Sequence, residues 1–165
     1  MRVFRLSYTL LLATAVCVSA LPSGFATAET HNTVSAEELD AGWILLFDGE
    51  SLYGWRAASD ANWRVADGTI CAEKGNAGLL YTTSQWGNFE LKVDFRCEQS
   101  GNSGVFLRTP PSPPATPGRY YEFNIADGPD EPWPTGSLVH HKKADAVPAN
   151  DGWRTMHMIA DGSHF

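Results

Sequence analysis

The segment from Phe89 to Cys97 constrains the fold of this chain most, because apolar and charged side chains alternate in it without a break. A period of two residues is that of a β-strand with one face in a core and the other turned away from it. The apolar positions are Phe89, Leu91, Val93, Phe95 and Cys97, and the charged positions are Glu90, Lys92, Asp94 and Arg96. The segment therefore predicts a long strand with one buried face.

Further strands are indicated by short apolar runs between turn residues. Residues 43–47 form one such run, closed by Asp48-Gly49, and predict a strand buried on both faces. Residues 63–66 and 69–72 are joined by Asp67-Gly68, a dipeptide that favours the tight turn of a β-hairpin. Gly101 to Gly104 is predicted to turn into a strand over 105–108, and residues 120–125 and 153–160 are predicted as later strands.

The chain offers little that could form a helix. Ser35 to Glu38 resembles a helix start, but Gly42 limits the helix to about one turn. The 15 glycines and 10 prolines indicate frequent turns. Many short strands without a long amphipathic helix are typical of an antiparallel sandwich or barrel.

Eight of the ten prolines lie between Pro110 and Pro134, in two clusters. Proline cannot donate a ladder hydrogen bond, so residues 110–117 and 129–134 are predicted as loops outside the sheets. Trp133 lies in the second cluster. Such loops either wall a binding site or run through solvent as linkers, and composition favours the second alternative slightly.

Residues 1–28 have the three parts of a secretory signal peptide. Arg2 and Arg5 give a positive start, residues 6–21 are largely apolar, and Ala26-Thr27-Ala28 is a small-x-small cleavage site. We expect a mature chain that begins at Glu29, is secreted or periplasmic, and is not an integral membrane protein. The alternative is an uncleaved anchor. Residues 29–38 are then a polar segment before the folded domain.

Charge and cysteines narrow the function further. The formal net charge of −7 argues against a nucleic-acid-binding surface, and 43% hydrophobic residues suit a folded domain. Outside the predicted signal peptide the chain has two cysteines, Cys71 and Cys97. An oxidising compartment permits a disulfide between them, and two separately buried thiols are an equally good interpretation.

Several segments together resemble one family, the 3-keto-disaccharide hydrolase domain. Trp43 to Trp55 resembles its opening motif, Trp63 to Gly68 its hairpin, and Gly101 to Arg108 (Gly-Asn-Ser-Gly-Val-Phe-Leu-Arg) matches a further motif throughout. Phe89 to Phe95, Tyr121 to Ile125 and Thr135 to Leu138 fit the remaining motifs in order. The resemblance covers residues 39–165.

The resemblance implies a concanavalin-like antiparallel jelly-roll sandwich. It also implies hydrolysis of glycosides that are already oxidised to a ketone at C3, so the expected partner is a small oxidised sugar. Family members usually continue with further strands after the position of Phe165. We therefore expect this chain to be a fragment with C-terminal strands missing; its oligomeric state is not predicted.

A ketone at C3 acidifies the hydrogen on C2, so this chemistry needs a general base near C2 and a positive group near the C3 oxygen. Glu122 is the candidate base, because it shares a strand face with Tyr120 and Asn124, opposite apolar Tyr121, Phe123 and Ile125. The alternative is a solvated strand glutamate. Arg108 is the candidate cation, with a surface ion pair as the alternative.

Four more residues complete the predicted substrate contacts with Tyr120: Asn124, Trp133, His141 and Lys142. His140 and His141 are adjacent, and neighbours on a strand point to opposite faces, so both cannot easily hold one metal. A divalent cation would suit an enolate and stays open as a cofactor, although the sequence has no strong metal-ligand signature; no other cofactor is predicted. The competing prediction is a non-catalytic carbohydrate-binding module in which Trp86, Trp133 or Tyr120 stacks on the sugar.

Overall fold

The computed structural model describes residues 2–3, 7–9, 32–98, 100–110, 120–146 and 152–165 of the chain. In chain order their elements are β1 (Arg2–Val3), β2 (Ser7–Thr9), α1 (Ala36–Asp40), β3 (Trp43–Ile44), β4 (Trp55–Ala57), β5 (Arg64–Ala66), β6 (Thr69–Cys71), β7 (Leu80–Thr82), β8 (Phe89–Arg96), β9 (Asn102–Leu107), β10 (Tyr121–Ala126) and β11 (Arg154–Ala160). The architecture is all-β, as the sequence predicts.

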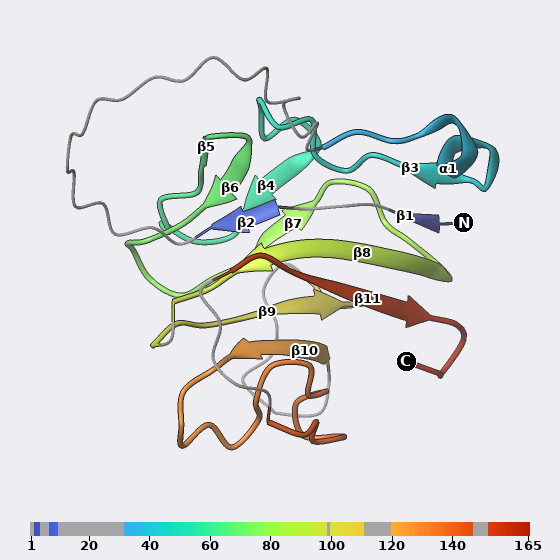
Figure 1. Cartoon of the computed structure of the whole chain (residues 1–165). Coiled ribbons are helices and arrows are strands. Elements are labelled where there is room, and N and C mark those ends of the chain that lie inside the picture. The colour runs from blue at the N-terminus through green and yellow to red at the C-terminus, as the bar shows by residue number, and fades with distance from the viewer. Residues whose placement is uncertain (1, 4–6, 10–31, 99, 111–119, 147–151) are drawn as a thin grey trace, which may run out of the picture.

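β8 is the centre of the main sheet (Figure 1). β11 pairs antiparallel along one edge of β8, with Arg154 opposite Phe95 and Ala160 opposite Phe89. β1 and β2 pair parallel along its other edge. β3 lies beyond β1, and β6 and β5 lie beyond β2. The strand with the strictest alternation is thus paired on both sides.

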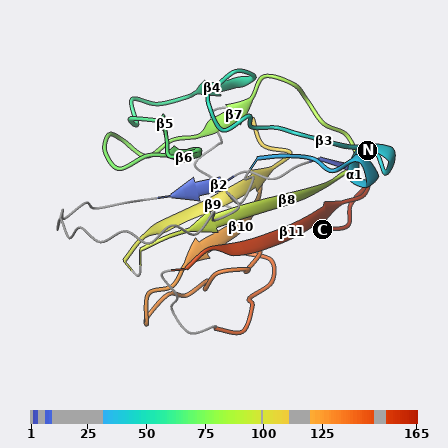
Figure 2. The same ribbon diagram turned by 45° about the horizontal axis from the view of Figure 1, so that its top comes forward.

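Two smaller antiparallel sheets pack around this one. β9 pairs with β10, with Tyr121 opposite Leu107 and Ala126 opposite Asn102. β4 pairs with β7, with Trp55 opposite Thr82. Figure 1 shows β9 and β10 on one side of β8 and β11, and β4 and β7 on the other, and Figure 2 keeps the β4–β7 pair apart from β10. The result is a layered β-sandwich.

The core lies between β8–β11 and β9–β10. Its buried members are Phe89, Val93, Phe95, Cys97, Leu107, Ile125, Met158 and Ala160. These residues include four of the five apolar positions predicted on the alternating strand, and the fifth, Leu91, packs against them. The predicted apolar face of this strand is confirmed.

The opposite face of β8 is less exposed than a charged face suggests. Asp94 is buried and accepts a 2.6 Å hydrogen bond from the Thr155 hydroxyl of β11. The Lys92 ammonium lies 4.4 Å from the ring centre of buried Trp43, which covers part of this face. Pairing and packing partners thus cover part of the charged side.

Two local predictions, the Asp-Gly hairpin turn and the helix start at Ser35, are confirmed. Asp67 and Gly68 have φ values of 49° and 68°, and two positive φ angles are what a type I′ hairpin turn between β5 and β6 requires. At α1, the Ser35 hydroxyl accepts a hydrogen bond from the Glu38 amide and the Glu38 carboxylate accepts one from the Ser35 amide. This capping box supports the single predicted turn of helix.

Three element predictions are corrected. The apolar run over 43–47 contributes strand residues only at Trp43–Ile44. The turn predicted over 101–104 is shifted: Gly101 donates to the Glu98 carbonyl at 2.8 Å, and β9 already begins at Asn102, because Asn102 and Ser103 pair with β10. His140 and His141 lie in a turn closed by bonds between Leu138 and Lys142, so the assignment of their faces by strand parity was wrong.

The two cysteines are separate thiols in the structure. Cys71 and Cys97 are both free and buried. β2 lies between β6, which ends at Cys71, and β8, which ends just before Cys97. Two strand spacings amount to about 9–10 Å, and a disulfide needs Cα atoms within about 7 Å. Of the two interpretations, the geometry favours separately buried thiols.

Some predictions concern residues outside the described ranges. These are most of the signal peptide and residues 111–117 of the first proline-rich loop. The described parts of residues 1–28, β1 and β2, belong to the main sheet; the signal peptide stays a prediction. In the part of the chain that the structure describes, no helix has the length and apolar character needed to cross a membrane.

Candidate functional site

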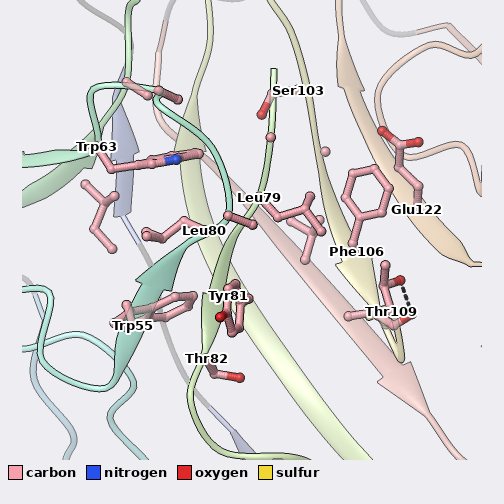
Figure 3. Close-up of a pocket in the computed structure, with 18 of the residues that line it drawn as sticks. Trp55, Trp63, Leu79, Leu80, Tyr81, Thr82, Ser103, Phe106, Thr109 and Glu122 are labelled. Atoms are coloured by element: carbon pink, nitrogen blue, oxygen red, sulfur yellow. Dashed lines mark hydrogen bonds between the residues drawn. The ribbon is translucent and has the colours of Figure 1, made fainter. Parts of the chain in front are cut away.

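A cleft of about 1290 Å³ lies among the β4–β7 pair, β8 and β9. Leu91, Val93 and Phe95 of β8 contribute to its lining. In Figure 3, Trp55, Trp63 and Leu80 lie on one side, and Phe106 and Glu122 lie on the other. Clefts of a few hundred to about a thousand Å³, apolar with a few polar groups, are the usual places for small ligands.

One side of the cleft is an aromatic wall, made of Trp55, Trp63 and Tyr81 together with Leu79 and Leu80. The indole nitrogen of Trp55 donates a 2.7 Å hydrogen bond to the Leu46 carbonyl, so this ring is fixed to the segment before it. Aromatic faces of this kind pack well against the C–H faces of a sugar ring or against an apolar substituent.

Two segments, residues 58–62 and 73–79, contribute to the lining of the cleft together with the aromatic wall and are called the rim loops. The Asn62 side-chain oxygen accepts hydrogen bonds from the Glu73 and Lys74 amides, both at 2.8 Å. The Asp60 carboxylate accepts one from the Asn76 amide at 2.8 Å. Side chains of residues 58–62 therefore hold the loop over 73–79 in place.

Glu122 is the acid of the opposite side. It lies on β10 directly opposite Phe106 of β9, and both line the cleft (Figure 3). The side chain is partly buried, and burial raises the pKa of the Glu122 carboxyl above its ordinary value. Among the residues that the structure describes, none donates a hydrogen bond to this carboxylate. Within the described part of the chain its lone pairs are therefore available to a ligand, and a carboxyl whose pKa is raised by burial is suited to proton transfer.

Arg108 is close to the same cleft but is already engaged. It follows β9 with a φ of 51° and donates to the Gly162 carbonyl and, at 2.9 Å, to the Asn88 side-chain oxygen. Its guanidinium carbon also lies 5.2 Å from the ring centre of Phe165. Arg108 lines the cleft, but its hydrogen-bond partners belong to the turns at 87–88 and 161–162. Among the described residues it forms no bond with Glu122.

Asn124 shares the strand face of Glu122 but is buried, and its amide donates to the Trp133 carbonyl. The Ala126 amide and Asp127 carboxylate both bond to the Thr135 hydroxyl, at 2.9 and 2.7 Å. These bonds fold residues 127–136 back onto β10. Asn124 and Trp133 thus hold this loop in place, and neither lines the cleft.

The remaining predicted contacts are dispersed. The Tyr120 ring packs against Phe106 at 5.4 Å between ring centres, next to the cleft. His141 stacks on Tyr121 at 5.3 Å and, like Lys142, is exposed on the turn after β10. Of the predicted substrate contacts, Tyr120 is the one whose resolved packing reaches a cleft residue.

The aromatic wall is not predicted by the sequence patterns. Trp55 and Trp63 enter them only as parts of motifs, and β7 is not among the predicted strands. The available signal is a Trp directly after Gly54 and another just before the Asp-Gly hairpin. Trp86, a predicted stacking residue, does line the cleft, with its indole nitrogen donating to Thr82 at 3.1 Å.

No group of three or more His, Cys, Asp or Glu side chains in the described ranges is arranged so that it could hold a metal ion.

Comparison with known proteins gives two matches. Residues 42–165 match the family described as the 3-keto-alpha-glucoside-1,2-lyase-like domain. A 3-keto-disaccharide hydrolase of Bacteroides thetaiotaomicron is 32% identical over an alignment of 77 residues, and the match covers 39% of this chain and 27% of that protein. The match thus spans about a quarter of the relative's length.

Proposed function

Because the chain belongs to the family of 3-keto-alpha-glucoside-1,2-lyase-like domains, we propose that its cleft binds a glycoside oxidised at C3 and cleaves the bond at C1. The name of the Bacteroides thetaiotaomicron relative supports hydrolysis as the net reaction. The observation that carries the proposal is Glu122: a partly buried carboxyl with a raised pKa, free of partners among the described residues, at the edge of a cleft.

In the proposed reaction, the Glu122 carboxylate removes the proton from C2, and the C2–H electron pair moves toward the C3 carbonyl to give an enolate. The enolate then returns its electrons, a C1–C2 double bond forms, and the C1–oxygen bond breaks. The leaving oxygen takes up a proton. Water adds to C1 and a proton returns to C2, so the sum is hydrolysis. This route needs one well-placed base rather than the two carboxylates of an ordinary glycosidase.

The aromatic wall would hold the substrate against this base. Stacking on Trp55, Trp63 or Tyr81 fixes a ring without using hydrogen bonds, so the polar side of the cleft remains for the reacting atoms. Thr109 and Ser103 also line the cleft, and the hydroxyl of Thr109 is occupied by the Leu107 carbonyl at 2.9 Å. Arg108 is proposed at the rim, where it orders the two turns and contributes positive charge.

The test is Glu122→Gln, which keeps the size of the side chain but removes the proton acceptor. We expect the turnover of a 3-keto-disaccharide to fall about 10²–10⁴-fold, the usual cost of a lost general base. Exchange of the C2 hydrogen with deuterated solvent should fall equally, because it reports proton removal without departure of the C1 group. Binding should survive, since the amide occupies the same space.

The unoxidised parent disaccharide is the matched control, because its C2 hydrogen is not acidic. Turnover of both sugars at one rate would contradict the elimination route. A Glu122→Gln variant that exchanges C2 and turns over like the parent protein would leave the cleft as a plain carbohydrate-binding surface.

A further inference from the structure

Gly104 lies beside the Glu122 carboxyl in a way that leaves no room for a side chain. A Cβ atom built on Gly104 would lie 2.6 Å from Oε1, 2.9 Å from Cγ and 3.2 Å from Cδ of Glu122. Gly104 pairs with Asn124, so Glu122 reaches it diagonally across the β9–β10 pair. The carboxyl thus lies on bare backbone.

The residues around Glu122 leave the space over Gly104 open to its carboxyl. Phe106 is directly opposite on β9, and its ring packs on Tyr120 at 5.4 Å between ring centres. Asn124, the next residue on the same face, is buried and directed to the Trp133 carbonyl. No described residue donates a hydrogen bond to the carboxylate, and within the described part of the chain the close approach to Gly104 is the contact that limits where it can lie.

We infer that Gly104 is a positioning residue for Glu122. The space left by the missing side chain at position 104, here called the seat of Glu122, lets the carboxyl lie at the edge of the cleft. This inference rests on the proposed function, in which the carboxyl at that place is the general base. Gly104 does not have the positive φ that only glycine adopts readily, so its backbone conformation is open to alanine. The three atoms nearest to the built Cβ are all side-chain atoms of Glu122 (Oε1, Cγ and Cδ), and therefore we expect the Glu122 side chain to move rather than the sheet.

The first measurement is the turnover of a 3-keto-disaccharide by Gly104→Ala in the full chain. We expect kcat to fall about 10²-fold, because a shift of about 1 Å in a reacting group has that cost, while KM changes little. In the Glu122→Gln background the same Gly104→Ala change should have no further effect on kcat, because it acts through the carboxylate.

The pH profile gives a readout that a merely structural role would not move. Burial raises the pKa of Glu122, and a carboxyl pushed from its seat toward the water of the cleft loses part of that burial. The rate depends on the ionised form, so the acid limb of kcat against pH should move to lower pH in Gly104→Ala.

Melting temperatures test the seat without any activity. Gly104→Ala should lower the melting temperature when Glu122 is present, and should be neutral or stabilising in the Glu122→Ala background, where the conflict is gone. Gly128→Ala is the matched control. A Cβ at Gly128 would also meet a glutamate side chain, at 3.2 Å from Cγ of Glu131, but outside the cleft. Its kcat should equal that of the parent.

The outcomes separate the two claims. If Glu122→Gln is slow but Gly104→Ala turns over like the parent, the positioning role is overturned and the proposed function stands. If Gly104→Ala slows the Glu122→Gln background by the same factor as the parent, the residue acts independently of Glu122 and the inference is also overturned. If Glu122→Gln is as active as the parent, the proposed function itself fails.

Discussion

Asp127 and Arg154 form the most deeply buried ion pair among the described residues. Both guanidinium Nη atoms donate to the Asp127 carboxylate, whose side chain is 2% exposed, against 16% for Arg154. The Arg154 guanidinium also lies 4.7 Å from the ring centre of Phe95. Burial would raise the pKa of Asp127, but bonds from Arg154 and Thr135 outweigh it, and the pKa is lowered. The pair ties the end of β10 to β11.

Replacing Arg154 by Met should therefore destabilise the fold by about 3–5 kcal/mol at pH 7, because a buried carboxylate loses its partner. A lowered folded-state pKa gives stability that is present above the unfolded pKa, about 3.9, and lost as pH falls through the folded value. In the Arg154→Met variant, burial raises the pKa of Asp127 and no arginine opposes it, so protonation of Asp127 no longer lowers the stability of the fold. The difference between parent and variant should shrink below about pH 4, as denaturant unfolding at pH 7 and pH 3 would measure.

Arg64→Met is the matched control for this prediction. Arg64 pairs with Glu73 at the surface, with side chains 42% and 24% exposed. Such exposed pairs contribute about 0–1 kcal/mol. Equal losses of stability in the two variants at pH 7 would contradict the structural importance of the buried pair.

The sequence predicts the direction of a side chain where the alternation of faces along a strand is enough to determine it. Placing Glu122 away from Phe123 and Ile125 follows from a period of two, and the structure puts it at the cleft. Parity was not enough for Asn124. That side chain faces the same way, but it is covered by a loop whose return depends on bonds to Trp133 and Thr135. A strand pattern carries no information about which loop folds over its face.

The two rim loops are the elements that give the aromatic wall its shape. A Cβ on Gly75, which has a φ of 102°, would lie 2.5 Å from the Asp60 carbonyl oxygen and 2.6 Å from the Ala61 Cα. These are backbone atoms and cannot rotate away. The loop over 73–79 can therefore approach residues 58–62 only because residue 75 has no side chain.

Gly75→Ala should push the loops apart and weaken binding of the 3-keto sugar about tenfold or more, with a clear fall in melting temperature. Gly42→Ala is the control, because Gly42 also has a positive φ, 85°, but nothing within 4 Å of a built Cβ. It should show only the backbone cost of about 1–2 kcal/mol and unchanged binding. Calorimetry would measure the affinity of each variant for the sugar, and melting curves would measure its stability. Similar effects of the two changes on affinity would show that the loop contact does not shape the site.

Elements with local signals could be predicted from the sequence, and those without could not. The alternation over 89–97 and the Asp67-Gly68 turn correspond to β8 and the β5–β6 hairpin. β7 has no comparable pattern, since Leu80 to Thr82 becomes a strand by pairing with β4, more than twenty residues earlier in the chain. The turn at His140 depends likewise on the return of residues 138–142 to β10.

For the molecule as a whole, we propose export with cleavage after Ala28, on the evidence of Arg2, Arg5 and the Ala26-Thr27-Ala28 site. This cleavage would remove β1 and β2 from the main sheet. N-terminal sequencing of the exported protein should then give Glu29 first. Replacing Ala28 by Arg should leave the longer form, because the cleavage site needs a small residue.

Thr27→Ser is the control for this experiment, since it keeps the small residues on both sides of the middle position. It should be processed like the parent. An intact form beginning at Met1 that stays inside the cell would show that residues 1–28 have another role.

The two sides of the cleft come from different parts of the chain and are supported separately. The aromatic side is built from residues before Phe89 and is fastened by Asp60 and Asn62, whereas the carboxyl side is carried by β9 and β10. Mutations that reshape one half during evolution need not disturb the other. On the proposed function, related chains can thus come to accept different ligands at the aromatic side while the carboxyl at Glu122 keeps its place on β10.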